Sequence, residues 1–188
     1  MKEAIKIGIV SENPHNDGTP IADLLERYFP EKASYTQLLP RFRGSQLGND
    51  DFIRALETIF EEDDLAFIIL IKDLDRDANR KKCNEVFEKC KCATNEKIEF
   101  LLFEYMIEAL AIADIATTCF KYKKKPHEIR ITANTKNAKK ALIDTFGYEE
   151  SDMRDLVQLF DIEKLKTYPI WQTFIKKMTE KVNISPVF

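Results

Sequence analysis

The stretch LAFIILIKDLDRDANRKKC, residues 65–83, sets an apolar run directly before three aspartates. Every residue from 65 to 71 is apolar, which is typical of a strand buried on both faces, as strands of parallel sheets are. Asp73, Asp75 and Asp77 then follow at every second position. Like charges so close together repel at neutral pH unless water solvates them or a cation holds them. The stretch therefore predicts a central strand that is followed by a charged loop.

The remainder of the chain alternates short apolar runs with amphipathic segments. This order predicts an α/β fold in which helices flank a parallel sheet, followed by a helical C-terminal part. We expect residues 1–125 to form the α/β core and residues 126–188 to form a helical extension packed on the same domain. The expected strands are 4–10, 33–39, 65–71 and 97–106, the expected helices are 21–29, 50–62, 78–90 and 107–120, and the pattern is helical from about 134 onward.

Composition narrows the class of protein. The 188 residues, of which 44% are hydrophobic, suffice for one domain with a full core. No apolar run is long enough to span a membrane and the N-terminus lacks a signal peptide pattern, so we expect a cytoplasmic protein without a membrane partner. The four cysteines contain no C-x-x-C pair, which argues against structural zinc. A net charge of −3 leaves only local patches for nucleic acid.

Acidic residues follow two of the expected strands. Glu12 comes two residues after the first strand, and Asp73 and Asp75 come two and four residues after the strand at 65–71. Ligand sites of parallel sheets lie beyond the carboxyl ends of the strands. If the two strands are neighbours, these carboxylates converge, and hard oxygen ligands of this kind suit Mg²⁺ or Mn²⁺. Such an ion could polarise a phosphodiester and supply a bound hydroxide.

Other structural roles could also explain the aspartates. A calcium-binding EF-hand loop begins with D-x-D-x-D, but Ala78 and Asn84 stand where that loop needs Gly and Glu. Acidic residues also favour the first turn of a helix, and this explains Asp77 better than metal ligation does. A solvated loop remains open for all three aspartates.

Two motifs of the sequence resemble those of a known protein family. IGIVSE, residues 7–12, followed by IILIKDLDRD, residues 68–77, is similar to the TOPRIM domain of topoisomerases, primases, small ribonucleases and overcoming-lysogenization-defect nucleases. The family marks are a Glu after the first strand and a D-x-D after a later one. The resemblance implies a Rossmann-like TOPRIM parallel sheet and Mg²⁺-dependent phosphodiester cleavage. It assigns Glu12, Asp73, Asp75 and Asp77 as metal ligands, with Glu12 also a possible general base.

A second segment extends the resemblance. MIEALAIAD, residues 106–114, is similar to a segment of small standalone TOPRIM-like proteins that are often partnered with an ABC-type ATPase in anti-phage defence. It implies such a partner, allows a homodimer, and suggests that Glu108 points inward to support the metal; an exposed Glu108 is the alternative. Two positions depart from the family. Asn13 stands where most members have Gly, and Asp17 comes five residues after Glu12 where the family often has an acid at four.

Basic residues provide candidate contacts to nucleic acid. Lys72 and Arg76 flank the D-x-D and could contact the scissile phosphate, and the lysines of KYKKKPH, residues 121–127, surround Tyr122 as a stacking aromatic. The same charges also fit a solvated face or a helix end. The candidate nucleic-acid contacts are Lys72, Arg76, Arg41, Arg43, Lys123 and Lys124.

Two functions from different classes follow. The first is a Mg²⁺- or Mn²⁺-dependent nuclease acting on DNA or RNA, with Glu12, Asp73, Asp75 and Glu108 in its catalytic site. The second is a regulatory or adaptor subunit that keeps the fold and binds its partner ATPase, which the departures from the first family motif suggest. A receiver-like phospho-acceptor domain shares the fold class, but the paired aspartates fit it poorly.

Overall fold

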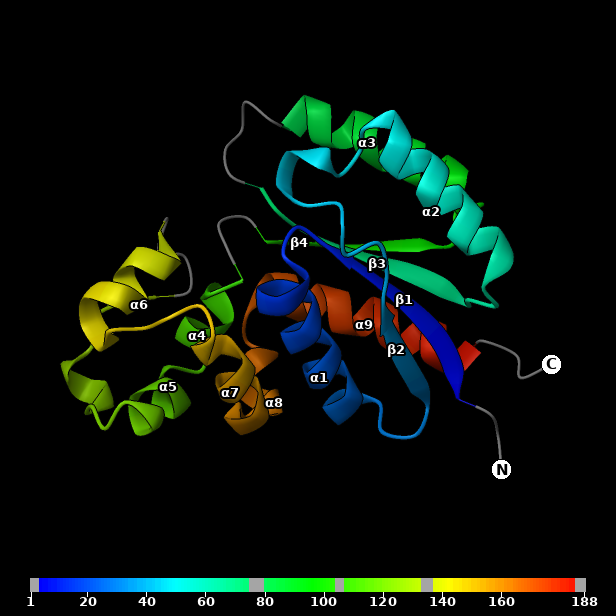
Figure 1. The fold of residues 1–188 in the computed structure, drawn as a ribbon. Coiled ribbons are helices and arrows are strands. Elements are labelled where there is room, and N and C mark those ends of the chain that lie inside the picture. Colours follow the sequence, from blue (N-terminus) through cyan, green and yellow to red (C-terminus); the bar gives the residue numbers. More distant parts are fainter. Residues whose placement is uncertain (1–3, 75–79, 104–106, 133–136, 185–188) are drawn as a thin grey trace.

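The computed structural model describes residues 4–74, 80–103, 107–132 and 137–184 of the chain. Within these ranges an all-parallel sheet has the strand order β2-β1-β3-β4, and helices cover both of its faces (Figure 1). The predicted α/β fold with a helical C-terminal part is confirmed. The strands are β1 Ile5–Ser11, β2 Ala33–Gln37, β3 Phe67–Asp73 and β4 Ile98–Phe103.

The central strand β3 is buried on both faces, as its unbroken apolar sequence predicts. Phe67, Ile69 and Ile71 belong to one hydrophobic cluster, whereas Ile68 and Leu70 belong to the other. Successive side chains of a strand point to opposite faces, so an apolar residue at every position fills both cores. β3 therefore forms the middle of a three-layer arrangement.

Helices cover both faces of the sheet (Figure 1). On one face, α2 and α3 pack on the cluster that contains Phe52, Leu56 and Phe87. On the other, α1 and α9 contribute Leu24 and Trp171 to the larger cluster. The bounds of these helices are α1 Thr19–Tyr28, α2 Asp50–Glu62, α3 Arg80–Ala93 and α9 Pro169–Ile184.

Shorter helices, α4 to α8, gather beside the sheet, next to α1 (Figure 1), and we call them the helical part. Arg27 joins the two parts, because its Nη2 donates to the carbonyl oxygen of Phe160 at 2.6 Å. In the part of the chain that the structure describes, no helix has both the length and the apolar character needed to cross a bilayer. The short helices are α4 Ala109–Ala113, α5 Ile115–Lys121, α6 Ala138–Phe146, α7 Asp152–Leu159 and α8 Ile162–Leu165.

The single helix predicted at 107–120 is wrong, because the chain breaks at Asp114 into α4 and α5. Asp114 is 1% exposed, and its Oδ1 accepts the backbone N–H of Thr117 at 3.3 Å. Its Oδ2 accepts the backbone N–H of Asp161 at 2.8 Å. A capping carboxylate begins a new helix here, and its second partner comes from a distant part of the chain.

The strand order creates a switch point between β1 and β3. The chain leaves β1 for β2 on one side and then crosses back to β3 on the other side of β1. Ligand sites of open parallel sheets lie at such points, outside the carboxyl ends of the strands. Ser11 pairs with Ile71 in the β1–β3 register. Glu12, Lys72 and Asp73 therefore come side by side at one edge of the sheet.

Candidate functional site

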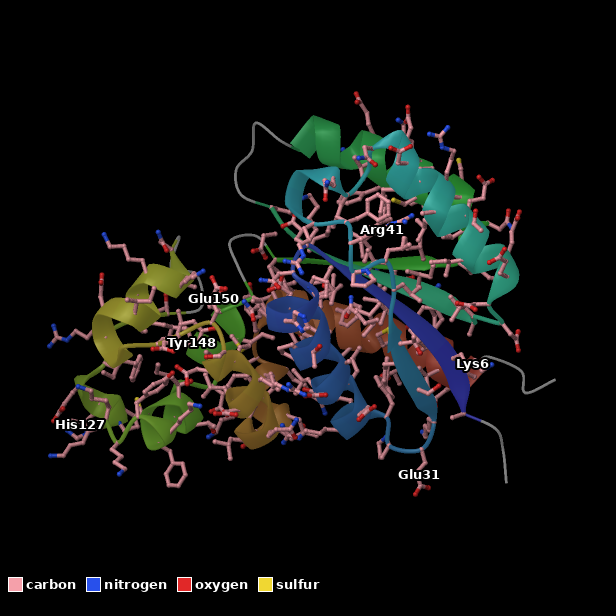
Figure 2. The ribbon with its side chains drawn as sticks, in the orientation of Figure 1. Lys6, Glu31, Arg41, His127, Tyr148 and Glu150 are labelled. Atoms are coloured by element: carbon pink, nitrogen blue, oxygen red, sulfur yellow. The ribbon has the colours of Figure 1, made fainter. Side chains whose placement is uncertain are left out.

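A polar cavity of about 200 Å³ lies at this carboxyl edge, and we call it the acidic cavity. Five carboxylates and a single lysine line it, so it concentrates negative charge. Figure 2 shows Tyr148 and Glu150 where the helical part meets the sheet. The lining residues are Glu12, Asn13, Asn16, Asp17, Asp73, Glu108, Lys139, Tyr148 and Glu150.

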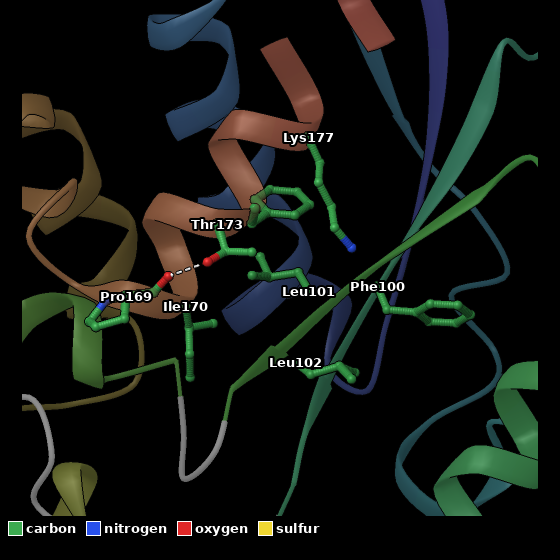
Figure 3. A pocket seen from close by; sticks show the side chains of 8 residues that line it. Phe100, Leu101, Leu102, Pro169, Ile170, Thr173 and Lys177 are labelled. Atoms are coloured by element: carbon green, nitrogen blue, oxygen red, sulfur yellow. Dashed lines mark hydrogen bonds between the residues drawn. The ribbon is translucent and has the colours of Figure 1, made fainter. Parts of the chain in front are cut away.

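A second cavity, of about 310 Å³, lies between β4 and α9 and has a different character (Figure 3). Its walls are mostly apolar, and Lys177 is the charged residue among them. Lys177 Nζ lies 3.6 Å from Glu99 Oε2, and Thr173 donates to the carbonyl oxygen of Pro169 at 2.9 Å. This cavity lacks clustered titratable groups, so we place the candidate chemistry in the acidic cavity.

The wall after β1 is a short π-helical turn, η1, Pro14–Gly18. Its defining bond runs from the Gly18 N–H to the carbonyl oxygen of Asn13, at 3.3 Å. Asn13 caps the turn, and its own N–H donates to Asp17 Oδ2 at 3.1 Å. π-helical turns are rare in proteins, but those that occur are often found at functional sites. The turn brings Asp17 into the same cavity as Glu12.

Asp17 is the most strongly perturbed acid of the cavity. Its pKa is raised to about 7, first by burial and then by the negative charges of Glu108 and Glu12, while the hydrogen bond from the Asn13 N–H and the charge of Lys139 act in the opposite direction. A buried carboxyl beside other carboxyls keeps its proton because a further negative charge is unfavourable there. Asp17 can therefore hold and release a proton near neutral pH.

Glu108 points inward and is 5% exposed, as the resemblance to TOPRIM-like proteins suggests. It lies just before α4, and burial raises its pKa, which a hydrogen bond from Tyr148 and the charge of Lys139 oppose. Tyr148 follows Gly147, which ends α6 in the left-handed conformation with φ of 69°. Glycine adopts this conformation without steric cost. The helix end thus turns Tyr148 into the cavity.

The last two residues of β3 are Lys72 and Asp73. Lys72 Nζ forms an ion pair with Glu12 Oε1, and both side chains are mostly buried. Asp73, the last residue of β3, lines the cavity directly. A lysine here neutralises one of the carboxylates that sequence reasoning assigned to a metal, so a cation at Glu12 would have to displace Lys72.

Glu150 closes the cavity from the helical side. Its Oε2 accepts a hydrogen bond from Asn16 Nδ2 at 2.5 Å, and its Oε1 forms an ion pair with Lys139. Asn16 belongs to η1 and Lys139 to α6. The connection between α6 and α7 is therefore tied to the loop that follows β1.

The cavity offers the oxygen donors that a hard divalent cation prefers. Among the residues that the structure describes, no three carboxylate, histidine or cysteine side chains form a group placed to hold a metal ion. Mg²⁺ commonly binds through one or two carboxylates and keeps several waters. Glu12 and Asp73 line one cavity, and after burial the negative charges of Glu108 and Glu12 also raise the pKa of Asp17, a repulsion that a cation would relieve. The donor chemistry fits such an ion.

Several predicted residues lie elsewhere or outside the description. Asp75, Arg76 and Asp77 fall in 75–79, beyond the described residues. Arg41 and Arg43 are exposed on the loop after β2, which reaches the site through a 3.4 Å bond from the Gly44 N–H to the Glu12 carbonyl oxygen.

Arg41 also lies over the ring of Phe42, with 4.9 Å between the guanidinium carbon and the ring centre. Lys123 and Lys124 are exposed beyond the end of α5, outside the acidic cavity.

Four lining residues were missed by sequence reasoning: Asn16, Lys139, Tyr148 and Glu150. Gly147 signals a helix end, but nothing in the sequence near it indicates that the next residue faces a sheet edge more than a hundred residues away in the chain. The spacing between Glu12 and Asp17 is visible in the sequence. The burial of Asp17 is not, because the polar SENPHNDG loop has the composition of an exposed loop.

A scan against protein-family models and searches of curated proteins and of solved structures found no match for this chain.

Proposed function

We propose that this protein is a divalent-metal-dependent nuclease of the TOPRIM type, acting on DNA or RNA in the cytoplasm. One observation carries the proposal: Glu12, Asp17, Asp73 and Glu108 line one cavity at the switch point of a parallel sheet. Four buried or half-buried carboxylates in one small space are unfavourable without a cation or protons. A role in anti-phage defence with an ABC-type ATPase, and a homodimer, rest on the resemblance of residues 106–114.

The π-helical turn supports the resemblance at the point where the sequence departs from the family. A second acid is often four residues after the Glu in that family, whereas Asp17 is five residues after Glu12. A π-helical turn closes with an i to i+5 bond, one residue wider than an α-helical turn. The added residue is thus absorbed by η1, and Asp17 still lines the cavity with Glu12.

The residues divide into four roles. Glu12 and Asp73 would hold Mg²⁺ or Mn²⁺. The ion would polarise the phosphate of the substrate and supply a bound hydroxide. Asp17, with its pKa near 7, holds a proton that it can give to the leaving oxygen. Lys72, once released from Glu12, would contact the phosphate. Glu108 is held by Tyr148 and keeps the cavity acidic.

Cleavage of labelled single-stranded and duplex DNA and RNA, with Mg²⁺ or Mn²⁺, tests the proposal. Asp73→Asn keeps the size of the side chain and removes its charge, so we expect it to lower the cleavage rate by about 100-fold or more. Asp64→Asn is the matched control, because Asp64 is exposed before the opposite end of the same strand. Equal activity of the wild type and Asp73→Asn would refute the assignment.

A regulatory or adaptor subunit is the second candidate, and the ion pair between Lys72 and Glu12 favours it. This lysine already neutralises a predicted metal ligand, as expected of a cavity that has lost its ion. The adaptor predicts stable binding to a partner ATPase together with no Mn²⁺ binding. The nuclease predicts the reverse for Mn²⁺, so a metal titration separates the two.

A further inference from the structure

A basic surface lies at the outer end of the helical part, formed by residues 120–130, and we call it the basic tip. It carries five lysines or arginines and one glutamate, in a chain whose net charge is −3. Residues 123–128 are all exposed. Figure 2 shows His127 projecting from the edge of the molecule remote from the sheet. The tip therefore concentrates positive charge on a protein that is acidic as a whole.

An exposed aromatic side chain accompanies these charges. Phe120 is 77% exposed, the most exposed of the large hydrophobic residues described. Tyr122, which the sequence suggests as the stacking residue, is used internally instead. Its hydroxyl donates to Asp152 at 2.6 Å, and its ring centre lies 5.4 Å from that of Phe146. The aromatic face that remains free for a ligand is that of Phe120.

In the turn after α5, the backbone of Lys123 adopts an unfavourable conformation. Its φ is 55°, in the left-handed region that glycine adopts without cost. The turn is fixed by bonds from the Lys123 N–H to the Phe120 carbonyl oxygen at 3.2 Å and from the Lys124 N–H to that of Cys119 at 2.9 Å. Backbone strain that glycine would relieve is a reason to look for a function of the side chain.

The base of the tip is anchored to the elements that build the acidic cavity. Lys121 lies 3.1 Å from Asp152 and 2.8 Å from Asp155, both on α7. The connection between α6 and α7 also supplies Tyr148 and Glu150 to the cavity. Lys121 is therefore committed to the fold, while Lys123, Lys124 and Lys125 remain on the exposed turn that follows.

We propose that the basic tip binds single-stranded nucleic acid, with Phe120 stacking on a base and Lys123, Lys124 and Lys125 contacting phosphates. This deepens the proposed nuclease function, on which it rests for the choice of nucleic acid as ligand. Stacking needs a base face that is not covered by a neighbouring pair, which favours an unpaired strand over a duplex. An exposed aromatic followed closely by exposed lysines matches the bases and phosphates of a single strand.

Fluorescence anisotropy of a labelled oligothymidylate, in EDTA to prevent cleavage, tests the tip. Phe120→Ala is expected to weaken binding by about tenfold, since stacking on one aromatic typically has this effect. Leu159→Ala is the matched control, because Leu159 is also an exposed apolar residue, on α7 outside the tip. Lys124→Gln is expected to lower the steepness of the salt dependence by about 0.7.

Lys123→Gly gives a readout that a structural role would not. It is expected to raise the stability of the fold by relieving the positive φ, and to weaken oligothymidylate binding at the same time. Unchanged binding by Phe120→Ala, or binding to anionic vesicles in place of the oligonucleotide, would overturn the inference. Binding that depends on Phe120, without cleavage in Mg²⁺, would support the basic tip and contradict the nuclease. Cleavage in Mg²⁺, with an affinity that does not depend on Phe120, would support the nuclease and contradict the basic tip.

Discussion

Asp17 is the residue at which the charge of the acidic cavity should be measurable. Its pKa is about 7 in the folded protein against 3.8 for an ordinary aspartate, so between these values the folded state holds a proton that the unfolded chain has lost. The stabilisation from this proton is full below pH 3.8 and is lost as pH rises through 7. Stability should fall with pH in this window by up to about 1.4 kcal/mol per pH unit.

Asp17→Asn should remove this dependence, because an amide does not titrate. Urea unfolding at several values between pH 5 and pH 8 would measure the free energy of unfolding of the wild type and the variant. We expect a shallower slope for Asp17→Asn and a higher stability than the wild type at pH 8. Asp63→Asn, at an exposed position, should keep the wild-type slope. Parallel curves for the wild type and Asp17→Asn would contradict the raised pKa.

Asp114 shows how one side chain defines two elements. It caps α5 through the Thr117 N–H and also holds the Asp161 N–H before α8. Asp114→Ala removes a cap and leaves the partly buried N–H groups of Thr117 and Asp161 without this partner, so we expect a loss of about 1–3 kcal/mol in the free energy of unfolding. Asp144→Ala on the exposed side of α6 should change stability by less than about 0.5 kcal/mol. Chemical denaturation of both variants checks the comparison.

The sequence predicts elements well where the signal is local. The apolar run at 65–71 indicates β3, and Asp50–Glu62 has the spacing of an amphipathic helix, because both patterns reflect burial that neighbouring residues share. It fails where the deciding partner is distant. Asp114 breaks a helix with the help of Asp161, 47 positions later.

The same limit applies to the candidate site. Placing Glu12 beside Asp73 needs the strand order β2-β1-β3-β4, which no local pattern indicates. The wall formed by Lys139, Tyr148 and Glu150 needs the packing of α6 and α7 against η1. The sequence therefore predicts the acids of the sheet edge and Glu108, and misses Glu150 and its neighbours on the facing wall.

At the scale of the whole molecule, the acidic cavity lies where the sheet meets the helical part. The sheet edge supplies Glu12 and Asp73, and the helical part supplies Glu108, Tyr148 and Glu150. The basic tip lies at the far end of the same helical part (Figure 2). This arrangement separates a surface that attracts a nucleic acid backbone from a cavity that repels it unless a cation is bound.

The central claim is that the acidic cavity holds a divalent cation, and calorimetric titration with Mn²⁺ tests it most directly. We predict binding by the wild type and by the control Asp64→Asn, and affinities at least about 10- to 100-fold weaker for Glu12→Gln and Asp73→Asn. No binding by the wild type, or equal affinities for the wild type and Asp73→Asn, would contradict the account.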